Sequence, residues 1–399
     1  MPPYYLRTNQ PQKWHALQLN LAMDDDGSNP SPPYDLVILG ASGFTGKYVV
    51  REALKFLNTP SSPLKSFAVA GRNHSKLLDT LKWAAKPNSP PPSIAILTAD
   101  TADPVSLRML CSRTRLVLNC VGPFRLHGGP VVAACVQAGC DYLDICGEPE
   151  FMERMEFVYH DQAVETGSLV VSACGFDSVP AELGWMFNSK QWVYPAVPNR
   201  IEAYLSLESD KNIVANFGTY ESAVLGVAHM DKLIELRRSR PRRSKPKVRK
   251  KLSVLNLRLF VGLLARSSVG RWLLLNFPSF FSLGWFSKKG PSEDEVASAS
   301  FKMWFVGRGY SDLRTSINVG DKEVDAEIIT RIMGPDAGYL TTPIILLQCA
   351  LIVLGQRDRL PKGGVLTPGI VFGPMDLQER LQQNGISFDV ISRRIGSTK

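Results

Sequence analysis

The sequence lacks the cysteine patterns that mark metal or disulfide scaffolds. No two cysteines have CxxC spacing, which argues against a zinc site, so we expect no metal. The cysteine count is odd and the spacing is irregular, which favours reduced thiols and a cytoplasmic type of compartment. The seven positions are Cys111, Cys120, Cys135, Cys140, Cys146, Cys174 and Cys349.

The N-terminus lacks the uninterrupted apolar core of a secretory signal. Residues 1–23 contain no acid and carry Arg7 and Lys13, a faint resemblance to an organelle-targeting peptide. The alternative is a dispensable leader, because Met23 is followed by an acidic, proline-rich linker that ends where the first strand begins. We expect residues 1–33 to be a disordered leader.

Positive charge is not spread over the chain as a nucleic-acid-binding surface would need. The formal net charge is +9, but residues 237–251 carry ten Lys or Arg and no acid, so the remaining residues sum to −1. No recognisable nucleic-acid-binding fold surrounds this run, and we expect no nucleic-acid partner. The 399 residues, 44% hydrophobic and 21% charged, suffice for two domains with real cores.

A glycine-rich turn between a strand and a helix is the most informative feature present. The apolar run 36–39 is typical of a buried parallel strand, and an amphipathic helix follows three glycines spaced three apart. Such a turn offers positive φ, here expected at Gly43, and free N–H groups for a pyrophosphate. Ser42 replaces the second glycine of the commoner GxGxxG pattern, and the alternative is a turn without a ligand. The predicted contacts are Gly40, Ser42, Gly43, Phe44, Thr45 and Gly46.

The second predicted strand, 66–70, lacks the terminal acid that binds a ribose 2′-hydroxyl in NAD-type sites. Arg72 and Lys76 instead offer cations for a 2′-phosphate, so NADP(H) is favoured. The alternative is that both residues solvate the start of the next helix. Asn73 lies between them and is counted with the cofactor contacts.

Further strands end at residues that we also assign to the cofactor. A third strand, 94–97, runs into Asp100, and a fourth, 116–121, ends in a Gly-Pro turn that we place near the nicotinamide. Strands follow at 141–145 and 169–174. Six alternations of strand and helix predict an α/β fold, a doubly wound parallel sheet of Rossmann type. The fourth strand and its turn supply Asn119, Gly122, Pro123 and Phe124, and a helix is expected from His127.

Five ordered blocks resemble the saccharopine dehydrogenase-like oxidoreductases, a family that includes trans-acting enoyl reductases. They are GASGFTG at 40–46, AGR at 70–72, NCVGPF at 119–124, YLDICGE at 142–148 and CGFDSVP at 174–180. The resemblance implies an NADP-binding Rossmann domain over 34–190, a second α/β domain over 191–336, and a C-terminal part, 337–399, that returns to the first domain. No cluster suited to an amino-dicarboxylate is evident, so saccharopine is not implied as the substrate.

The second domain is expected to contain a mixed or antiparallel sheet. Its predicted strands are 200–208, 301–306, 316–319 and 324–332, and a helix from Asn216 to Leu236 contains a GTxxS pattern that resembles the family's cleft helix. Residues 343–354 form an apolar helix of about twelve residues, too short for a membrane span and expected to dock on the first domain. Residues 361–369 are expected to form a loop over the cleft.

A basic and then apolar insertion, 237–289, interrupts this second domain. Cations beside aromatic-rich helices suit an element lying on an anionic membrane or lipid droplet. The alternative is that its aromatic residues line a pocket or pack at the subunit interface of a homodimer. The expected location is therefore cytoplasmic or peripheral on an intracellular membrane.

Two residues are candidates for catalysis. Asp177 follows a strand at the carboxyl edge of the sheet, with capping of the next helix as its alternative role. Tyr220 lies on the predicted cleft helix, with packing as its alternative. The predicted function is NADP(H)-dependent reduction of an activated C=C or C=N bond in a hydrophobic small molecule. The alternative is a catalytically silent cofactor-binding scaffold on a lipid surface.

Overall fold

The computed structural model describes residues 32–85, 93–240, 249–253, 264–312 and 324–396, with only the backbone for 249–253. The predicted leader, up to residue 31, and the predicted strand 316–319 lie outside these ranges. The statements below concern the compact unit Pro33–Lys399.

The first sheet has seven parallel strands in the order β13-β6-β5-β4-β1-β2-β3, which confirms the predicted Rossmann-type sheet. The last strand comes from residues expected to form a loop over the cleft. That expectation is wrong, because Gly364–Leu366 pairs with β6 and extends the sheet. The strands are β1 Tyr34–Leu39, β2 Phe67–Gly71, β3 Ala95–Thr98, β4 Thr114–Asn119, β5 Asp141–Asp144, β6 Leu169–Val171 and β13 Gly364–Leu366.

Helices cover both faces of this sheet, as the alternating side chains of β1 require. Leu36 and Ile38 enter the core shared with α1, α2 and α14, whereas Val37 and Leu39 enter the core shared with α3, α4 and α5. Helix α4 begins at Phe124, three residues before the predicted start. The helices are α1 Phe44–Phe56, α2 His74–Ala84, α3 Pro104–Cys111, α4 Phe124–Ala138, α5 Pro149–Thr166, α6 Val179–Lys190 and α14 Thr342–Gln356.

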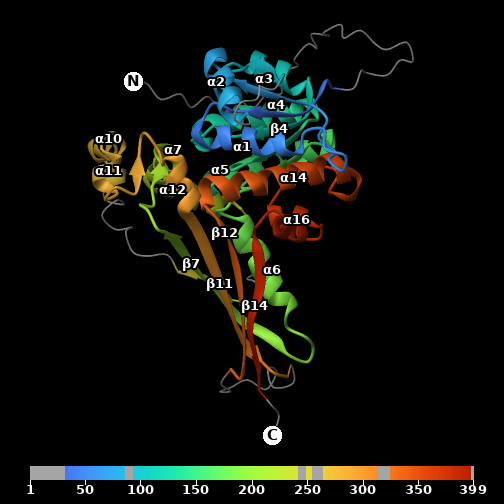
Figure 1. Ribbon diagram of the computed structural model, residues 1–399, viewed down its shortest axis with the longest axis vertical. Helices are drawn as coiled ribbons and strands as arrows, with labels where there is room; N and C mark the ends of the chain where they lie inside the picture. The colour runs from blue at the N-terminus through green and yellow to red at the C-terminus, as the bar shows by residue number, and fades with distance from the viewer. Residues whose placement is uncertain (1–31, 86–92, 241–248, 254–263, 313–323, 397–399) are drawn as a thin grey trace. The chain divides into compact units, whose positions relative to one another are not determined.

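The predicted docking helix is confirmed as α14, which lies along α1 (Figure 1). The helical run Ala337–Arg359 has 23 residues and is long and apolar enough to cross a membrane, so the length argument against a span is wrong. However, 83% of its most apolar window is buried inside the protein. A helix that is packed on every side needs apolar residues all round.

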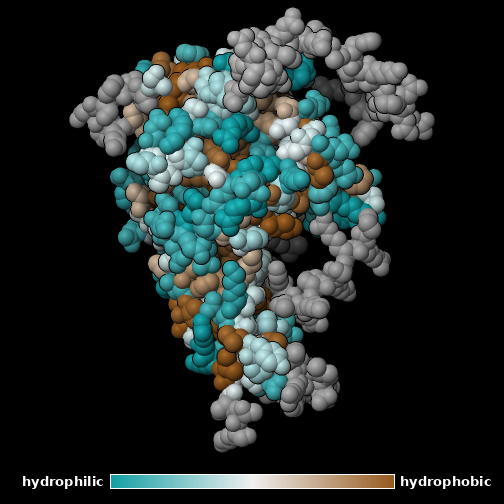
Figure 2. All heavy atoms as spheres, turned by 90° about the vertical axis from the view of Figure 1, so that its right-hand side faces the viewer, coloured by the Kyte–Doolittle hydropathy of each residue, from teal (hydrophilic) through white to brown (hydrophobic). Residues whose placement is uncertain are grey.

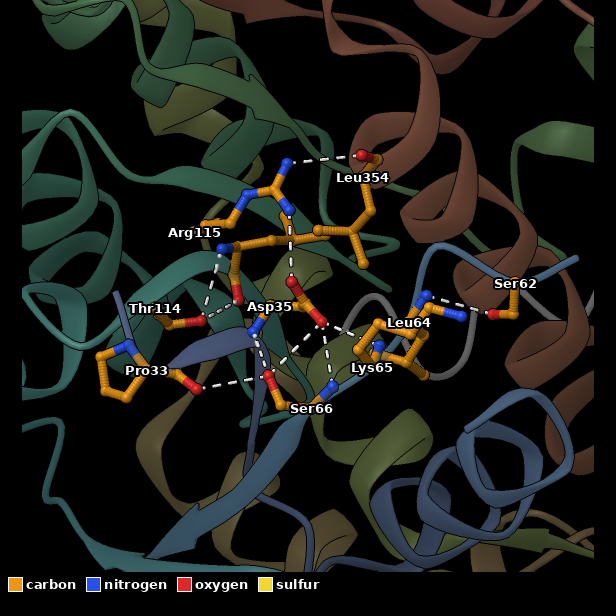
Figure 3. Close-up of polar contacts among 10 residues, drawn as sticks. Pro33, Asp35, Ser62, Leu64, Lys65, Ser66, Thr114, Arg115 and Leu354 are labelled. Carbon is orange, nitrogen blue, oxygen red and sulfur yellow. Dashed lines mark hydrogen bonds and ion pairs between the residues drawn. The ribbon is translucent and has the colours of Figure 1, made fainter. Parts of the chain in front are cut away.

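A polar cluster anchors the C-terminal end of α14 to the first sheet (Figure 3). The Asp35 carboxylate at the start of β1 accepts from Ser66 N at 2.9 Å and from Arg115 Nη1 at 3.2 Å. Arg115 also donates to the Leu354 carbonyl at 3.4 Å. These contacts lie at the amino ends of the strands, opposite the carboxyl edge where ligands bind in such folds.

The second sheet has the order β14-β12-β11-β7-β9 and is mixed, as predicted. Helix α6 leaves the first sheet and packs against β11 and β12 (Figure 1). The predicted return of the C-terminal part to the first domain holds for α14 and β13 but not for the last strand, which pairs with β12. The strands are β7 Val197–Ser209, β9 Arg249–Ser253, β11 Ala299–Tyr310, β12 Ala326–Pro335 and β14 Ser387–Ile395.

The remaining elements connect strands within the second sheet or lie on the connections between the two sheets. The predicted helix 216–236 is divided at His229 into α7 and α8, and a π-helical turn, η1, precedes α14. These elements are β8 Ala215–Asn216, α7 Phe217–Ala228, α8 Met230–Ser239, α10 Ser268–Asn276, α11 Pro278–Phe281, β10 Phe286–Ser287, α12 Glu293–Ser298, η1 Ala337–Thr341, η2 Arg357–Arg359, α15 Pro368–Phe372 and α16 Leu377–Gln383.

Candidate active site

The glycine turn depends on close packing at two of its three glycines. Gly40 has φ +81°, and a Cβ there would lie 2.7 Å from Val121 Cγ2. At Gly46 a Cβ would lie 2.2 Å from the Gly40 carbonyl oxygen, so glycine lets α1 pack on the turn. Gly43 has φ −70°, so the expectation of positive φ at Gly43 is wrong. The left-handed residue is Gly40, where the chain leaves β1 beneath Val121.

The N-terminus of α1 fits a pyrophosphate. The first N–H groups of a helix have no partner within it, and no side chain caps this one, among the residues described. The N–H groups of Phe44, Thr45 and Gly46 are therefore free to donate to an anion at the positive end of the helix dipole. Ser42 is exposed beside them, and the Phe44 ring packs on Tyr339 with its centroid 4.8 Å away.

The end of β2 fits a 2′-phosphate. Arg72 and Lys76 are exposed, and their side chains have no hydrogen-bonding or ionic partner in the described part of the chain. Asn73 caps α2, because its side chain accepts from Lys76 N at 3.0 Å. Asp100 accepts from Ala102 N at 3.0 Å and so shapes the turn after β3. The two free cations remain the candidates for the phosphate, whereas the Asn73 and Asp100 side chains bond within local turns.

Asn119 and Phe124 are built into the protein core. Asn119 is fully buried, accepts from Val121 N at 3.0 Å and donates to the Tyr142 hydroxyl at 3.1 Å. These bonds shape the turn that contains exposed Gly122 and buried Pro123. The sequence therefore located this turn correctly at the sheet edge, but the Asn119 side chain bonds within the protein.

Glu148, to which the sequence analysis gave no role, holds the start of α4. Its carboxylate accepts from Phe124 N at 2.8 Å and from Arg125 N at 3.1 Å, which stabilises the helix dipole. The Phe124 ring packs 5.9 Å from the Phe151 ring. Glu148 follows a different strand, so local spacing gives no signal for this contact.

A buried carboxylate organises the loops after β5 and β6. Asp144 accepts from the Tyr142 hydroxyl at 2.8 Å, the Ser172 hydroxyl at 3.0 Å, Cys146 N at 2.9 Å and Ala173 N at 2.8 Å. Burial raises the pKa of Asp144 to about 6 despite these four hydrogen bonds. Asp144 thereby fixes Cys146 and Ala173, which line a cavity.

This cavity of about 340 Å³ lies between the carboxyl edge of the first sheet and the second sheet. Its walls come from the start of α1, the ends of β5 and β6, and β7, β11, α7 and η1. The lining is largely apolar, with Ile145, Phe176, Leu205, Leu207 and Phe286, and includes no Lys, Arg or His among the described residues. A largely apolar cavity with a few polar groups is typical of a small-molecule site, and this one lies beside the glycine turn.

Asp177 faces this cavity. Ser178, not Asp177, occupies the N-cap position of α6, so the capping alternative is wrong. The carboxylate has no hydrogen-bonding partner within the described ranges. It lies close to the backbone at Gly147, where an added Cβ would be 2.4 Å from Asp177 Oδ2. The side chain is exposed to the cavity but closely surrounded by protein, and this desolvation raises the pKa of Asp177. The sequence placed Asp177 at the carboxyl edge of the sheet, and the structure shows that it lines the cavity there.

Tyr220 packs in a hydrophobic cluster, which was the alternative to a catalytic role. It is buried on α7 with Val224, Ala265 and Leu274, and its ring lies 5.3 Å from the Phe286 ring. Its hydroxyl has no partner among the residues described, and the residue that lines the cavity is its neighbour on α7, Thr219.

Tyr339, which the sequence analysis did not select, lines the cavity from η1. Its hydroxyl accepts from Asn216 N at 2.6 Å, and its own proton has no acceptor in the described structure. Burial raises the pKa of this hydroxyl, so it stays protonated. No motif marked Tyr339, because it reaches the cavity only through the connection between β12 and α14.

Comparisons with known proteins agree with this geometry. The model of the saccharopine dehydrogenase NADP binding domain matches residues 36–171. A probable mitochondrial saccharopine dehydrogenase-like oxidoreductase of Arabidopsis thaliana is 58% identical over 91% of this chain and 98% of its own. A lipid droplet localized protein of Caenorhabditis elegans is 31% identical over 90% of this chain and 98% of its own.

Among solved structures, apo saccharopine dehydrogenase (L-Glu forming) from Saccharomyces cerevisiae shares the fold, with a TM-score of 0.53 and 11% identity. The match covers 90% of this chain and 99% of the yeast chain.

Proposed function

Since the chain belongs to the saccharopine dehydrogenase-like oxidoreductases and binds NADP(H), we propose that it reduces an activated C=C or C=N bond in a hydrophobic small molecule. The observation that carries this proposal is the position of the apolar cavity. It adjoins Thr45 at the start of α1 and the ends of β5 and β6. In a sheet of this strand order, the reacting half of a dinucleotide lies at this edge.

The side chains divide the work of binding and chemistry. NADPH supplies the hydride when bound. The N–H groups at the start of α1 hold its pyrophosphate, and Arg72 and Lys76 hold its 2′-phosphate. The apolar wall keeps water from the acceptor. Among the polar groups that line the cavity, we assign the Asp177 carboxylate and the Tyr339 hydroxyl to orienting the acceptor or exchanging a proton with it.

The test is NADPH oxidation with a panel of uncharged enones and cyclic imines. We expect turnover with at least one acceptor, and loss of that turnover in Ser300→Phe, because Ser300 lines the cavity from β11. NADPH affinity should persist in this variant, since β11 belongs to the second sheet. If the protein binds NADPH but none of the acceptors in the panel causes NADPH oxidation, the result would contradict the reductase and support the silent scaffold.

The apolar surface of α10 and α11 supports a second candidate function, a cofactor-binding scaffold at a lipid surface. Phe280 is 75% and Leu283 82% exposed, and exposed Lys288 and Lys289 follow them. Cations beside exposed aromatic side chains suit an anionic lipid surface. The opposite face of the molecule is mostly hydrophilic, with its apolar residues in separate patches (Figure 2). The remaining apolar members of the α10–α11 patch are Val269, Trp272, Phe277 and Trp285.

Part of the basic run is already engaged within the protein. Arg237 donates to the Glu153 carboxylate, and Arg240 pairs with Glu156 at 3.0 Å, both on α5. Residues 241–248 lie outside the described ranges. The α10–α11 patch therefore gives the cleaner test of lipid contact than removal of the run.

We expect the double variant Trp272→Ser/Phe280→Ser to bind phosphatidylserine-containing liposomes about tenfold or more weakly, since each large apolar side chain contributes roughly 1.5–3 kcal/mol when buried. Cosedimentation measures this. The matched control is Val105→Ser/Met109→Ser, two exposed apolar residues on α3. A wild-type protein that does not sediment with these liposomes would show that the lipid scaffold is wrong.

A further inference from the structure

The carboxylates that line the cavity differ in whether they have a hydrogen-bonding or ionic partner in the protein. Three carboxylates line it, Asp177, Glu208 and Asp336. Glu208 pairs with Lys302 Nζ at 2.7 Å. Asp336 caps η1 by accepting from Tyr339 N. Only the Asp177 carboxylate lacks a protein partner among the described lining residues.

The protein makes space for this carboxylate. A Cβ at position 147 would lie 2.4 Å from Asp177 Oδ2, so any larger residue there would clash with the carboxylate in its present position. Apolar side chains such as Phe176 and Leu205 line the same cavity. A charged carboxylate that lines a cavity without a protein partner attracts a cationic ligand, and apolar walls strengthen this attraction because they lower the local dielectric constant.

We infer that the cavity takes an apolar molecule with one positive charge beside its reducible bond, that Asp177 is the counter-ion of this charge, and that carboxylate-bearing molecules are excluded. This inference rests on the proposed reductase function and narrows its substrate class to iminium ions, the protonated form of a C=N bond. The apolar lining holds the hydrocarbon part of the molecule, and the lack of Lys, Arg or His among the described lining residues leaves a carboxylate without a partner.

The charge of an iminium ion also fits the chemistry. The iminium carbon accepts hydride with its two electrons, the π pair of the C=N bond becomes the lone pair of the nitrogen, and the nicotinamide is oxidised. The positive charge of the acceptor disappears in this step, so no proton from Asp177 is required. Asp177 stabilises the charged acceptor and leaves the neutral amine free to dissociate or to take a proton from water.

The test compares three probes with one ring and different charges: benzylamine, benzyl alcohol and benzoate. Each is titrated calorimetrically into the NADPH-loaded protein. We expect benzylamine to bind about tenfold or more tightly than benzyl alcohol, as a hydrogen bond to a charged group predicts, and benzoate to bind more weakly than both. No saturable benzylamine binding, or benzoate binding as tight as that of benzylamine, overturns the inference.

Two variants locate the effect at Asp177. Asp177→Asn should remove the preference for benzylamine, and Gly147→Ala should reduce it by displacing a carboxylate that keeps its charge. The matched control is Glu208→Gln, which removes a lining acid already paired with Lys302 and should keep the preference. An unchanged preference in Asp177→Asn, or an equal loss in Glu208→Gln, overturns the inference.

These outcomes are separable from failure of the reductase proposal. A benzylamine preference that depends on Asp177, without oxidation of NADPH by any enone or imine, contradicts the reductase and supports the charge selection. Turnover of carboxylate-bearing acceptors in preference to neutral or cationic ones supports the reductase and overturns the charge selection.

Discussion

Gly46→Ala is expected to abolish measurable NADPH binding. The added Cβ would lie 2.2 Å from the Gly40 carbonyl oxygen, a backbone atom that no side-chain rotation can move. The start of α1 and the turn must then separate, which displaces the N–H groups of Phe44 and Thr45 from a pyrophosphate. Losing two hydrogen bonds to a charged group, each about 1.5–3 kcal/mol, corresponds to at least roughly a hundredfold weaker binding.

Fluorescence titration with NADPH measures the effect, and a thermal melt shows whether the variant folds. The matched control is Gly226→Ala on α7, where an added Cβ meets nothing within 4 Å. Its NADPH affinity should equal that of the wild type. A folded Gly46→Ala variant with normal affinity would show that the glycine turn does not hold the cofactor.

Arg72→Ala is expected to weaken NADPH binding about ten- to a hundredfold, because a charge-assisted contact to the 2′-phosphate is worth about 1.5–3 kcal/mol. NADH binding should barely change, since NADH lacks that phosphate. Paired titrations of both cofactors isolate the phosphate, because their other contacts are shared and cancel.

The matched control for Arg72 is Arg108→Ala, which removes an exposed arginine on α3 away from the end of β2. It should leave both affinities unchanged. Equal loss of NADPH and NADH affinity in Arg72→Ala would assign the side chain to adenine or to the fold. If Arg72→Ala changes neither affinity, the 2′-phosphate contact would be assigned to Lys76 instead. A wild-type protein that prefers NADH would refute the assignment of a 2′-phosphate site.

Features that depend on neighbouring residues were predicted correctly from the sequence. The apolar run 36–39 and the glycines after it each indicate their own surroundings, because a buried strand and a tight turn need particular residue types at short spacing. The alternation of strands and helices likewise predicted the sheet and its two covered faces. Position at the sheet edge also led to Asp177.

Some local expectations failed because the backbone conformation of a turn is decided by what packs on it. The positive φ belongs to Gly40, which lies beneath Val121, and not to Gly43. Asn119 lies at the sheet edge as expected, and the contact that its sequence position could not reveal is the hydrogen bond from its amide to the Tyr142 hydroxyl on the next strand.

The sequence by itself determined the parallel sheet, the glycine turn, the free cations after β2 and the apolar character of α14, since each is written in residues close together along the chain. Only the tertiary structure decided which groups meet at the cavity. Tyr339 and Asp177 are separated by more than a hundred residues, and Asp144 and Glu148 act on loops of other strands. The local sequence pattern also did not determine that β13 joins the first sheet and β14 the second. Short strands pair with whichever edge the folded chain offers them, and that choice depends on contacts between distant segments.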